Sequence, residues 1–240
     1  MMSRIFALGP ATRQSIRSRK LTSAIMAGLV SVLLAAAALP LNAAGTNPAE
    51  LNSNIETDAN VQAPVLAPLA THPRTAQIVV QQLRRNHYVD LKVNDALSSD
   101  MFDNYLEALD PGRYYFLAAD IAEFEGYRYE LDNALRRGDL LPAYRMFNRL
   151  QQRLLERTKY MQRAIDLGLE RLDFTTDEVI QIKRENVAWS IDQATQDDLW
   201  NRCLKSQVLS MKLNDKELKE IAETLAKRYR NQQKVALRNR

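Results

Sequence analysis

Residues 139–168 read DLLPAYRMFNRLQQRLLERTKYMQRAIDLG, and this stretch decides the fold class. Its apolar residues recur every three or four positions, which is the spacing of one face of an α-helix. The members of this face are Phe147, Leu150, Leu154, Met161 and Ile165. Asp139 can cap the helix, Pro142 is tolerated in its first turn, and Gly168 is a stop signal. The sequence therefore predicts a helix roughly 40 Å long, at about 1.5 Å per residue.

Helical patterns continue on both sides of this segment. Helices are predicted over residues 75–88, 94–109 and 118–137, and two more begin at capping-box sequences that start at Thr195 and Asn214. Residues 172–192 are less regular, and Phe174 with Val179-Ile180 could form a short extended piece. The expected fold class is all-α: a bundle of about six antiparallel helices joined by short loops, in one domain over 74–240, preceded by a signal peptide and a linker.

The sequence Asp110-Pro111-Gly112 separates two of these helices. Proline followed by glycine suits the second and third positions of a type II turn. We therefore predict such a turn at this point. Gly138 is the predicted stop signal of the helix over 118–137, which follows the turn.

The first 43 residues predict an export signal. They carry five basic residues, no acidic residue and an apolar run over 24–39, and they end in small residues. Cleavage after Ala43 or Ala44 is expected. An arginine-rich signal on a chain whose single cysteine excludes an intramolecular disulfide suits a bacterial periplasm, which is the expected location. An uncleaved inner-membrane anchor is the alternative, because the charge-free stretch 21–49 approaches the length of a membrane span. Residues 44–73 hold four prolines and little periodicity, so a flexible linker is expected.

The positive charge of the chain is concentrated at its two ends. The whole sequence has 33 Lys+Arg against 29 Asp+Glu. Removal of residues 1–43 would leave 28 against 29, so the mature chain is nearly neutral and no nucleic-acid partner is expected. Residues 227–240 hold six basic residues and no acidic one. We interpret them as a solvated helix end favoured by the helix dipole, with a binding patch as the alternative.

Residue types that carry catalysis or bind metals are sparse. His72 lies in the predicted linker and His87 at a predicted helix end, where a capping or packing role is expected because these ligands are too few for zinc. Cys203 is expected to fill the core, with a reactive thiol as the alternative. Lys205 adjoins Ser206, but neighbours on a helix do not face each other. No catalytic, cofactor-binding or metal-binding residue is therefore expected, and no small-molecule cofactor.

Several segments together resemble the N-terminal helical region of the tail-specific (carboxy-terminal processing) proteases of Gram-negative bacteria. They are residues 86–91 (NHYVDL), 102–117 (FDNYLEALDPGRYYFL), 120–124 (DIAEF), 198–202 (DLWNR) with Lys205, and 225–229 (LAKRY). The likeness covers roughly residues 73–240. Within it, we interpret the turn and the aromatic residues Tyr114, Tyr115 and Phe116 as structural, because large apolar side chains anchor such a turn.

The resemblance implies a parent serine endopeptidase that degrades or trims periplasmic proteins from apolar C-terminal tails. In the family a PDZ domain binds the tail and a Ser-Lys dyad cleaves it, and both lie downstream of the helical region. This chain is therefore expected to lack them, to be inactive by itself and to act as a scaffold that helps enclose the substrate. The last helix, about 215–240, is expected to lead into the missing part.

The resemblance also implies partners. They are the PDZ and protease domains of the parent chain and protein substrates with apolar C-termini, and a lipoprotein adaptor is a further candidate. The alternative function is a self-standing periplasmic helical binding or adaptor protein.

Overall fold

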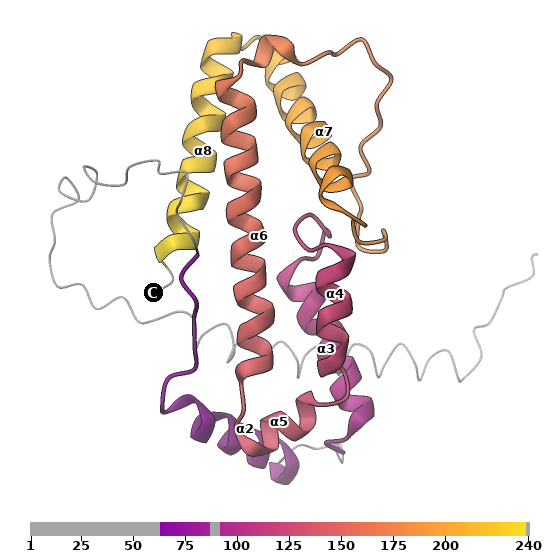
Figure 1. Cartoon of the computed structure of the whole chain (residues 1–240), viewed down its shortest axis with the longest axis vertical. Coiled ribbons are helices and arrows are strands. Elements are labelled where there is room, and N and C mark those ends of the chain that lie inside the picture. The colour runs from indigo at the N-terminus through magenta and orange to yellow at the C-terminus, as the bar shows by residue number, and fades with distance from the viewer. Residues whose placement is uncertain (1–62, 87–91, 239–240) are drawn as a thin grey trace, which may run out of the picture.

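The structure is a computed structural model, and it describes residues 63–86 and 92–238 (Figure 1). The predicted signal peptide and His87 lie outside these residues. The expected all-α class is confirmed, since the described ranges contain helices and no strand. The helices are α2 (His72–Asn86), α3 (Asp95–Leu109), α4 (Ala118–Phe124), α5 (Leu131–Arg137), α6 (Leu141–Asp166), α7 (Gln193–Lys212) and α8 (Leu218–Arg238), with short 3₁₀ helices η2 (Glu125–Tyr127) and η3 (Leu169–Arg171).

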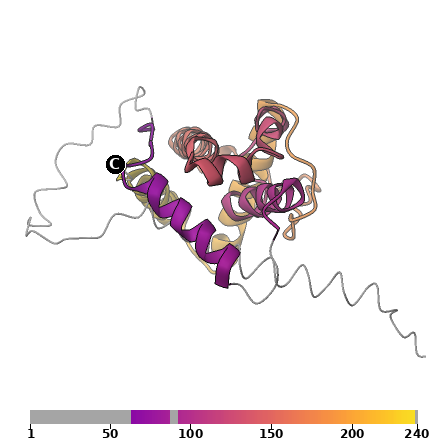
Figure 2. The ribbon, with the colours of Figure 1, turned by 90° about the horizontal axis from the view of Figure 1, so that it is seen from below.

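The long helix α6 is the axis of the fold. Figure 1 shows α8 antiparallel beside it, α7 on its other side, and α2 with α5 at its lower end, and Figure 2 gives the same arrangement from below. The connection after η3 runs back down the molecule, so α7 points in the same direction as α6. Residues 172–192 thus form a long irregular connection, in which Phe174 and Val179-Ile180 do not form the extended piece that was considered.

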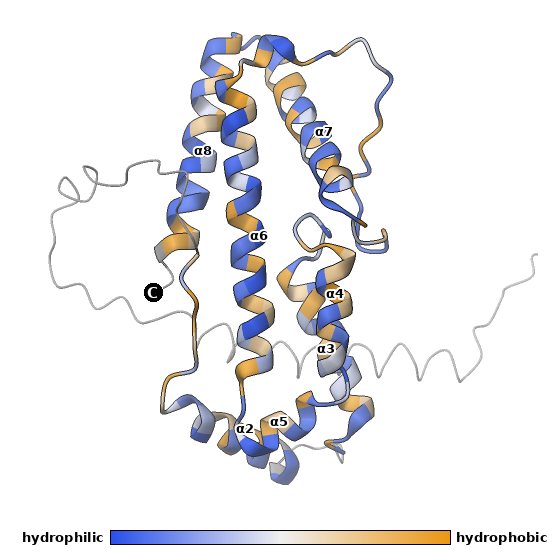
Figure 3. Ribbon diagram, in the orientation of Figure 1, coloured by the Kyte–Doolittle hydropathy of each residue, from blue (hydrophilic) through white to orange (hydrophobic). Residues whose placement is uncertain are grey.

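Buried apolar side chains form two clusters, and α6 contributes to both. The lower cluster lies among α2, α3, α4, α5 and the first half of α6, and includes Phe102 and Met146. The upper cluster lies among the second half of α6, η3, α7 and α8, and includes Met161 and Trp200. Figure 3 shows apolar and hydrophilic residues alternating along the long helices, as expected of amphipathic helices that cover a core.

The single helix predicted over 118–137 is wrong, because the segment divides into α4, η2 and α5. The first amide groups of α5 bind the hydroxyl of Ser98 on α3, which starts the helix anew at Leu131. The predicted stop at Gly138 is confirmed, with a left-handed φ of 74°. A Cβ at Gly138 would lie 2.8 Å from the carbonyl oxygen of Pro73, so the site excludes a side chain as well.

Two predicted helix starts differ from the structure. The cap of α7 is Asp192, whose carboxylate accepts a hydrogen bond from the amide of Thr195, so Thr195 lies within the first turn. The last helix begins at Leu218, later than the predicted cap Asn214, and Asp215 between them has a left-handed φ of 57°. A local turn therefore separates α7 from α8 where a capping box was predicted.

The described end of the predicted linker is attached to the helical domain. The amide nitrogen of Leu66 lies 2.9 Å from Oδ1 of Asn148 on α6, and Nδ2 of Asn148 donates to the carbonyl oxygen of Leu66 at 2.8 Å. Helix α2 begins at His72, so the last two residues of the predicted linker are helical. Within the described ranges, no helix combines the length and the apolar character that a membrane span requires.

Candidate functional site

The corner between α3 and α4 is organised by the buried carboxylate of Asp110, whose residue is 1% exposed. Its oxygens accept hydrogen bonds from the backbone amides of Tyr114, Tyr115 and Phe116, at 2.9, 2.8 and 3.1 Å. Burial raises the pKa of the Asp110 carboxyl, while the three amide donors and the charge of Arg157 oppose the rise. One side chain thus binds the backbone of residues 114–116. We call residues 110–117 the 110–117 corner.

The type II turn predicted at this corner is wrong. The amide of Arg113 does donate to the carbonyl of Asp110, at 3.1 Å. However, the left-handed residue is Arg113, with φ of 52°, whereas a type II turn needs a positive φ at Gly112. Gly112 is required for space instead, because a Cβ there would lie within 2.5 Å of the Tyr114 ring.

Helix α7 binds the corner through backbone oxygens. Nε2 of Gln196 donates to the carbonyls of Tyr114 and Tyr115, at 2.7 and 2.8 Å, and Nε1 of Trp200 donates to that of Tyr114 at 2.8 Å. Gln196 and Trp200 are both 1% exposed. The guanidinium of Arg157, on α6, lies over both tyrosine rings. These contacts agree with the structural interpretation of the corner.

Part of the irregular segment 172–192 packs on the same corner. Nε of Arg184 donates to the carbonyl of Gly112 at 3.0 Å, and the carbonyl of Ser190 accepts from the amide of Ala118 at 2.8 Å. The guanidinium of Arg113 donates to the carbonyl of Val187. The guanidinium carbon of Arg113 also lies 4.9 Å above the ring of Trp189, a cation–π geometry.

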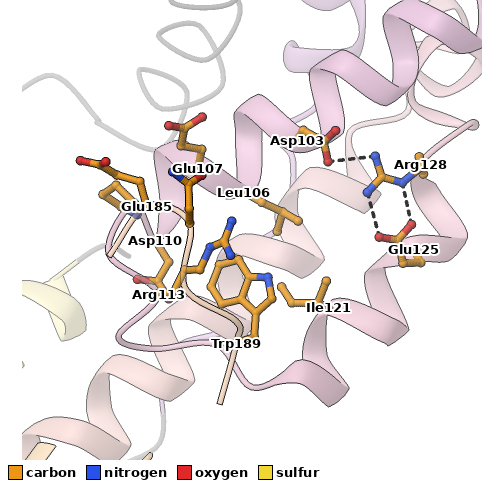
Figure 4. A pocket seen from close by; sticks show the side chains of 12 residues that line it. Asp103, Leu106, Glu107, Asp110, Arg113, Ile121, Glu125, Arg128, Glu185 and Trp189 are labelled. Carbon is orange, nitrogen blue, oxygen red and sulfur yellow. Dashed lines mark hydrogen bonds and ion pairs between the residues drawn. The ribbon is translucent and has the colours of Figure 1, made fainter. Parts of the chain in front are cut away.

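A pocket of about 300 Å³ lies beside the corner (Figure 4). Its apolar wall includes Leu106, Ile121 and Trp189, and its charged residues come from α3, the corner, η2 with the residue after it, and the irregular segment. The charged residues are Asp103, Glu107, Asp110, Arg113, Glu125, Arg128 and Glu185. Because this pocket combines charged side chains with an apolar wall beside the corner, it is our candidate functional site.

At one end of the pocket, the positive charge of Arg128 offsets part of the negative charge of Asp103 and Glu125. Its guanidinium forms two hydrogen bonds with Glu125, of 2.6 and 2.8 Å, and one of 2.8 Å with Asp103. The hydrogen bonds from Arg128 lower the pKa of Glu125. The guanidinium carbon of Arg128 also lies 4.4 Å from the centre of the Phe102 ring. Arg128 is therefore held in place at this end of the pocket.

The side chains considered for catalysis or metal binding that the structure describes, His72, Cys203 and Lys205, do not line the pocket. Nδ1 of His72 accepts from the amide of Leu69 at 3.2 Å and lies 3.1 Å from the Tyr144 hydroxyl, which is a packing role. Cys203 is buried in the upper cluster, as expected of core filling, and burial raises the pKa of its thiol. Lys205 pairs with Glu178 at 2.5 Å and so is directed toward the irregular segment.

Some structurally decisive side chains were missed by sequence reasoning. Ser98 is completely buried and its hydroxyl joins α3 to α5. Gln196 and Arg157 bind a corner that is more than forty residues away in the sequence. Helical periodicity says nothing about such distant pairs, although polar residues at inward positions of a helix were a usable signal. In the described ranges, no group of three or more His, Cys, Asp and Glu residues is arranged to hold a metal ion.

Comparison with known proteins finds a matching family and similar proteins. The family described as "Tail specific protease N-terminal domain" matches residues 79–239. A tail-specific protease of Haemophilus influenzae is 34% identical over 149 residues, which are 62% of this chain and 21% of that protease. The chain thus spans about a fifth of the length of that relative, and the residues matched by the family include the corner and its pocket.

Proposed function

This chain belongs to the tail-specific protease N-terminal domain family, and on that premise we propose that it is the helical scaffold of a serine endopeptidase acting on apolar C-terminal tails. The scaffold would hold the PDZ and protease domains of the parent chain and help to enclose the substrate. The Ser-Lys dyad would lie in those domains. This chain would be inactive by itself.

One observation carries the proposal. The family match covers most of this chain, whereas the chain covers only a fifth of the Haemophilus influenzae protease. Most of the relative's length therefore lies outside the matched helical region, and we place the catalytic part there. The polar groups of the 110–117 corner support the same conclusion. They are bound by Asp110, Gln196 and Trp200 and so serve the fold.

The setting of the enzyme is part of the proposal. The basic and apolar character of residues 1–43 supports export to the periplasm, with attachment to the inner membrane if the signal is not cleaved. We expect partners of three kinds: the protease and PDZ parts, protein substrates with apolar tails, and a lipoprotein adaptor.

A chimera tests the scaffold function. The 149-residue region of the Haemophilus influenzae protease would be replaced by the matching residues of this chain, and cleavage of a protein with an apolar C-terminal tail would be measured. We expect the chimera to cleave within about tenfold of the parent rate. The same protease with the region deleted should lose activity, and the 240-residue chain alone should not cleave.

Three outcomes contradict the proposal. Cleavage by this chain alone would show a catalytic site within it. A folded deletion protease with the parent rate would show that the helical region is dispensable. Activity of the deletion protease that returns only when this chain is added as a separate protein would favour the self-standing adaptor.

A further inference from the structure

The pocket beside the 110–117 corner combines an apolar wall with an acidic rim. Leu106, Ile121 and Trp189 form the wall, and the volume of about 300 Å³ suits one long side chain. Figure 4 shows Glu107 and Glu185 on one side of the pocket and Arg128 on the other. A group with an apolar stem and a cationic end matches these two surfaces.

The charges in the pocket do not balance. Arg128 is shared between Asp103 and Glu125, so these three groups neutralise one another in part. The guanidinium of Arg113 is held by the carbonyl of Val187 and the ring of Trp189. The pocket therefore keeps an excess of negative charge after its own arginines are taken into account.

Glu107 and Glu185 carry that excess at the rim. Both are exposed, and within the part of the chain that the structure describes neither carboxylate forms a hydrogen bond or an ion pair. They come from different elements, since Glu107 lies on α3 and Glu185 on the irregular segment that packs on the corner. Two carboxylates from two elements can bind one planar cation from two sides.

We propose that this pocket binds an arginine side chain presented by a segment of a partner polypeptide. The stem would lie against Leu106 and Ile121, and the guanidinium would bind Glu107 and Glu185. Arginine fits better than lysine because its planar, forked donors can serve two carboxylates at once and its flat face packs on apolar surface. This interaction goes beyond the scaffold function and does not depend on it.

A peptide titration tests the proposal with the purified 240-residue chain. The probe is a short glycine–serine peptide with one central arginine, and the readout is the indole N–H resonance of Trp189, assigned with Trp189→Phe. We expect saturable binding that weakens as salt is added, because exposed ion pairs are screened. The peptide with citrulline in place of arginine, which keeps the shape and loses the charge, should bind at least about fivefold more weakly.

Matched variants locate the interaction. Glu107→Gln with Glu185→Gln should weaken binding of the arginine peptide about fivefold. Glu217→Gln with Glu223→Gln removes the same charge from exposed positions near and on α8 and should leave binding within twofold. Unchanged amide spectra would show that both variants fold.

Four results would overturn the proposal. They are the absence of any shift with the arginine peptide, equal binding of the citrulline peptide, tighter binding of a glutamate peptide, and undiminished binding by the Glu107→Gln, Glu185→Gln variant. A lysine peptide that binds as tightly as the arginine peptide would overturn the preference for a planar cation.

Discussion

The hydroxyl oxygen of Ser98, in α3, lies 2.9 Å from the amide nitrogen of Leu131, the first residue of α5. The same oxygen accepts from the amide of Asp132 at 3.3 Å and donates to the carbonyl of Arg128 at 2.8 Å. Glu130, at the N-cap position of α5, makes no capping bond with its own side chain. The first amides of α5 are therefore capped from a different helix.

Ser98→Ala should destabilise the fold by about 2 kcal/mol, because it removes a cap and leaves buried backbone groups without a partner. The free energy of unfolding in urea measures this change. Ser210→Ala alters an exposed serine of α7 and should cost less than about 0.5 kcal/mol. Equal losses in the two variants would refute the capping role of Ser98.

Gly112→Ala should destabilise the fold by about 2 kcal/mol, because the new Cβ would overlap the Tyr114 ring and force it to move. Gly126→Ala is the matched control, since a Cβ at that position meets no atom within 4 Å. That change should leave the stability of the fold unchanged or raise it by about 0.5 kcal/mol, because alanine lowers the conformational entropy of the unfolded chain. Thermal unfolding of both variants distinguishes the two effects, and a stable Gly112→Ala protein would contradict the close contact.

Asp120→Asn should destabilise the fold by about 3 kcal/mol at neutral pH, since a buried ion pair would lose its anion. The Asp120 carboxylate, at 1% exposure, binds Arg153 at 2.8 and 2.9 Å, the amide of Leu117 at 2.9 Å, and Arg149. Unfolding in urea at pH 7 measures the loss. Asp177→Asn, at an exposed position, is the control and should change little.

The same carboxylate should make stability depend on pH. Burial favours the neutral acid, but the hydrogen bonds from Arg153, Leu117 and Arg149 together lower the pKa of Asp120. Because the pKa is lower in the folded than in the unfolded state, where it is about 3.9, its contribution is complete above about pH 5 and is lost as pH falls through the folded value. Unfolding free energies between about pH 2 and 7 should fall less steeply with acid in Asp120→Asn than in the wild type. An identical slope would show that other groups cause the dependence.

Cys203 should resist thiol reagents in the native protein. The side chain is buried in the upper cluster, and burial raises the pKa of its thiol, so little reactive thiolate is exposed. Ellman's reagent should react slowly with the native chain and promptly after urea is added. Ser206→Cys, exposed on the same helix, supplies the fast control. Rapid reaction of native Cys203 would mean that the upper cluster opens readily.

The helices with regular apolar spacing could be predicted from the sequence. Helix boundaries that depend on residues distant in the sequence could not. Helix α6 was found because apolar residues recur at helical spacing over most of the stretch from Phe147 to Ile165. The break between α4 and α5 was missed because its cause is Ser98, on another helix. Asp192 was overlooked as the cap of α7 because Thr195 offered an equally good local pattern.

The candidate pocket was not foreseen for a similar reason. The 110–117 corner was visible as a motif, but its turn type was misjudged because the left-handed conformation falls on Arg113. The segment 184–190 carries no periodic signal, and only the fold brings Trp189 beside Ile121. A pocket made by an irregular segment and a turn depends on tertiary contacts that one-dimensional spacing does not record.

Helix α6 has a mechanical consequence. Its 26 residues contain no glycine, and their only proline stands at the start. A continuous helix of this length is about 39 Å long and bends little. Since α2 and α5 lie at one end and η3 with the start of α8 at the other, α6 acts as a strut of fixed length. Any two modules fastened to opposite ends of this domain would be held at a constant separation, and a load applied to one would be passed to the other.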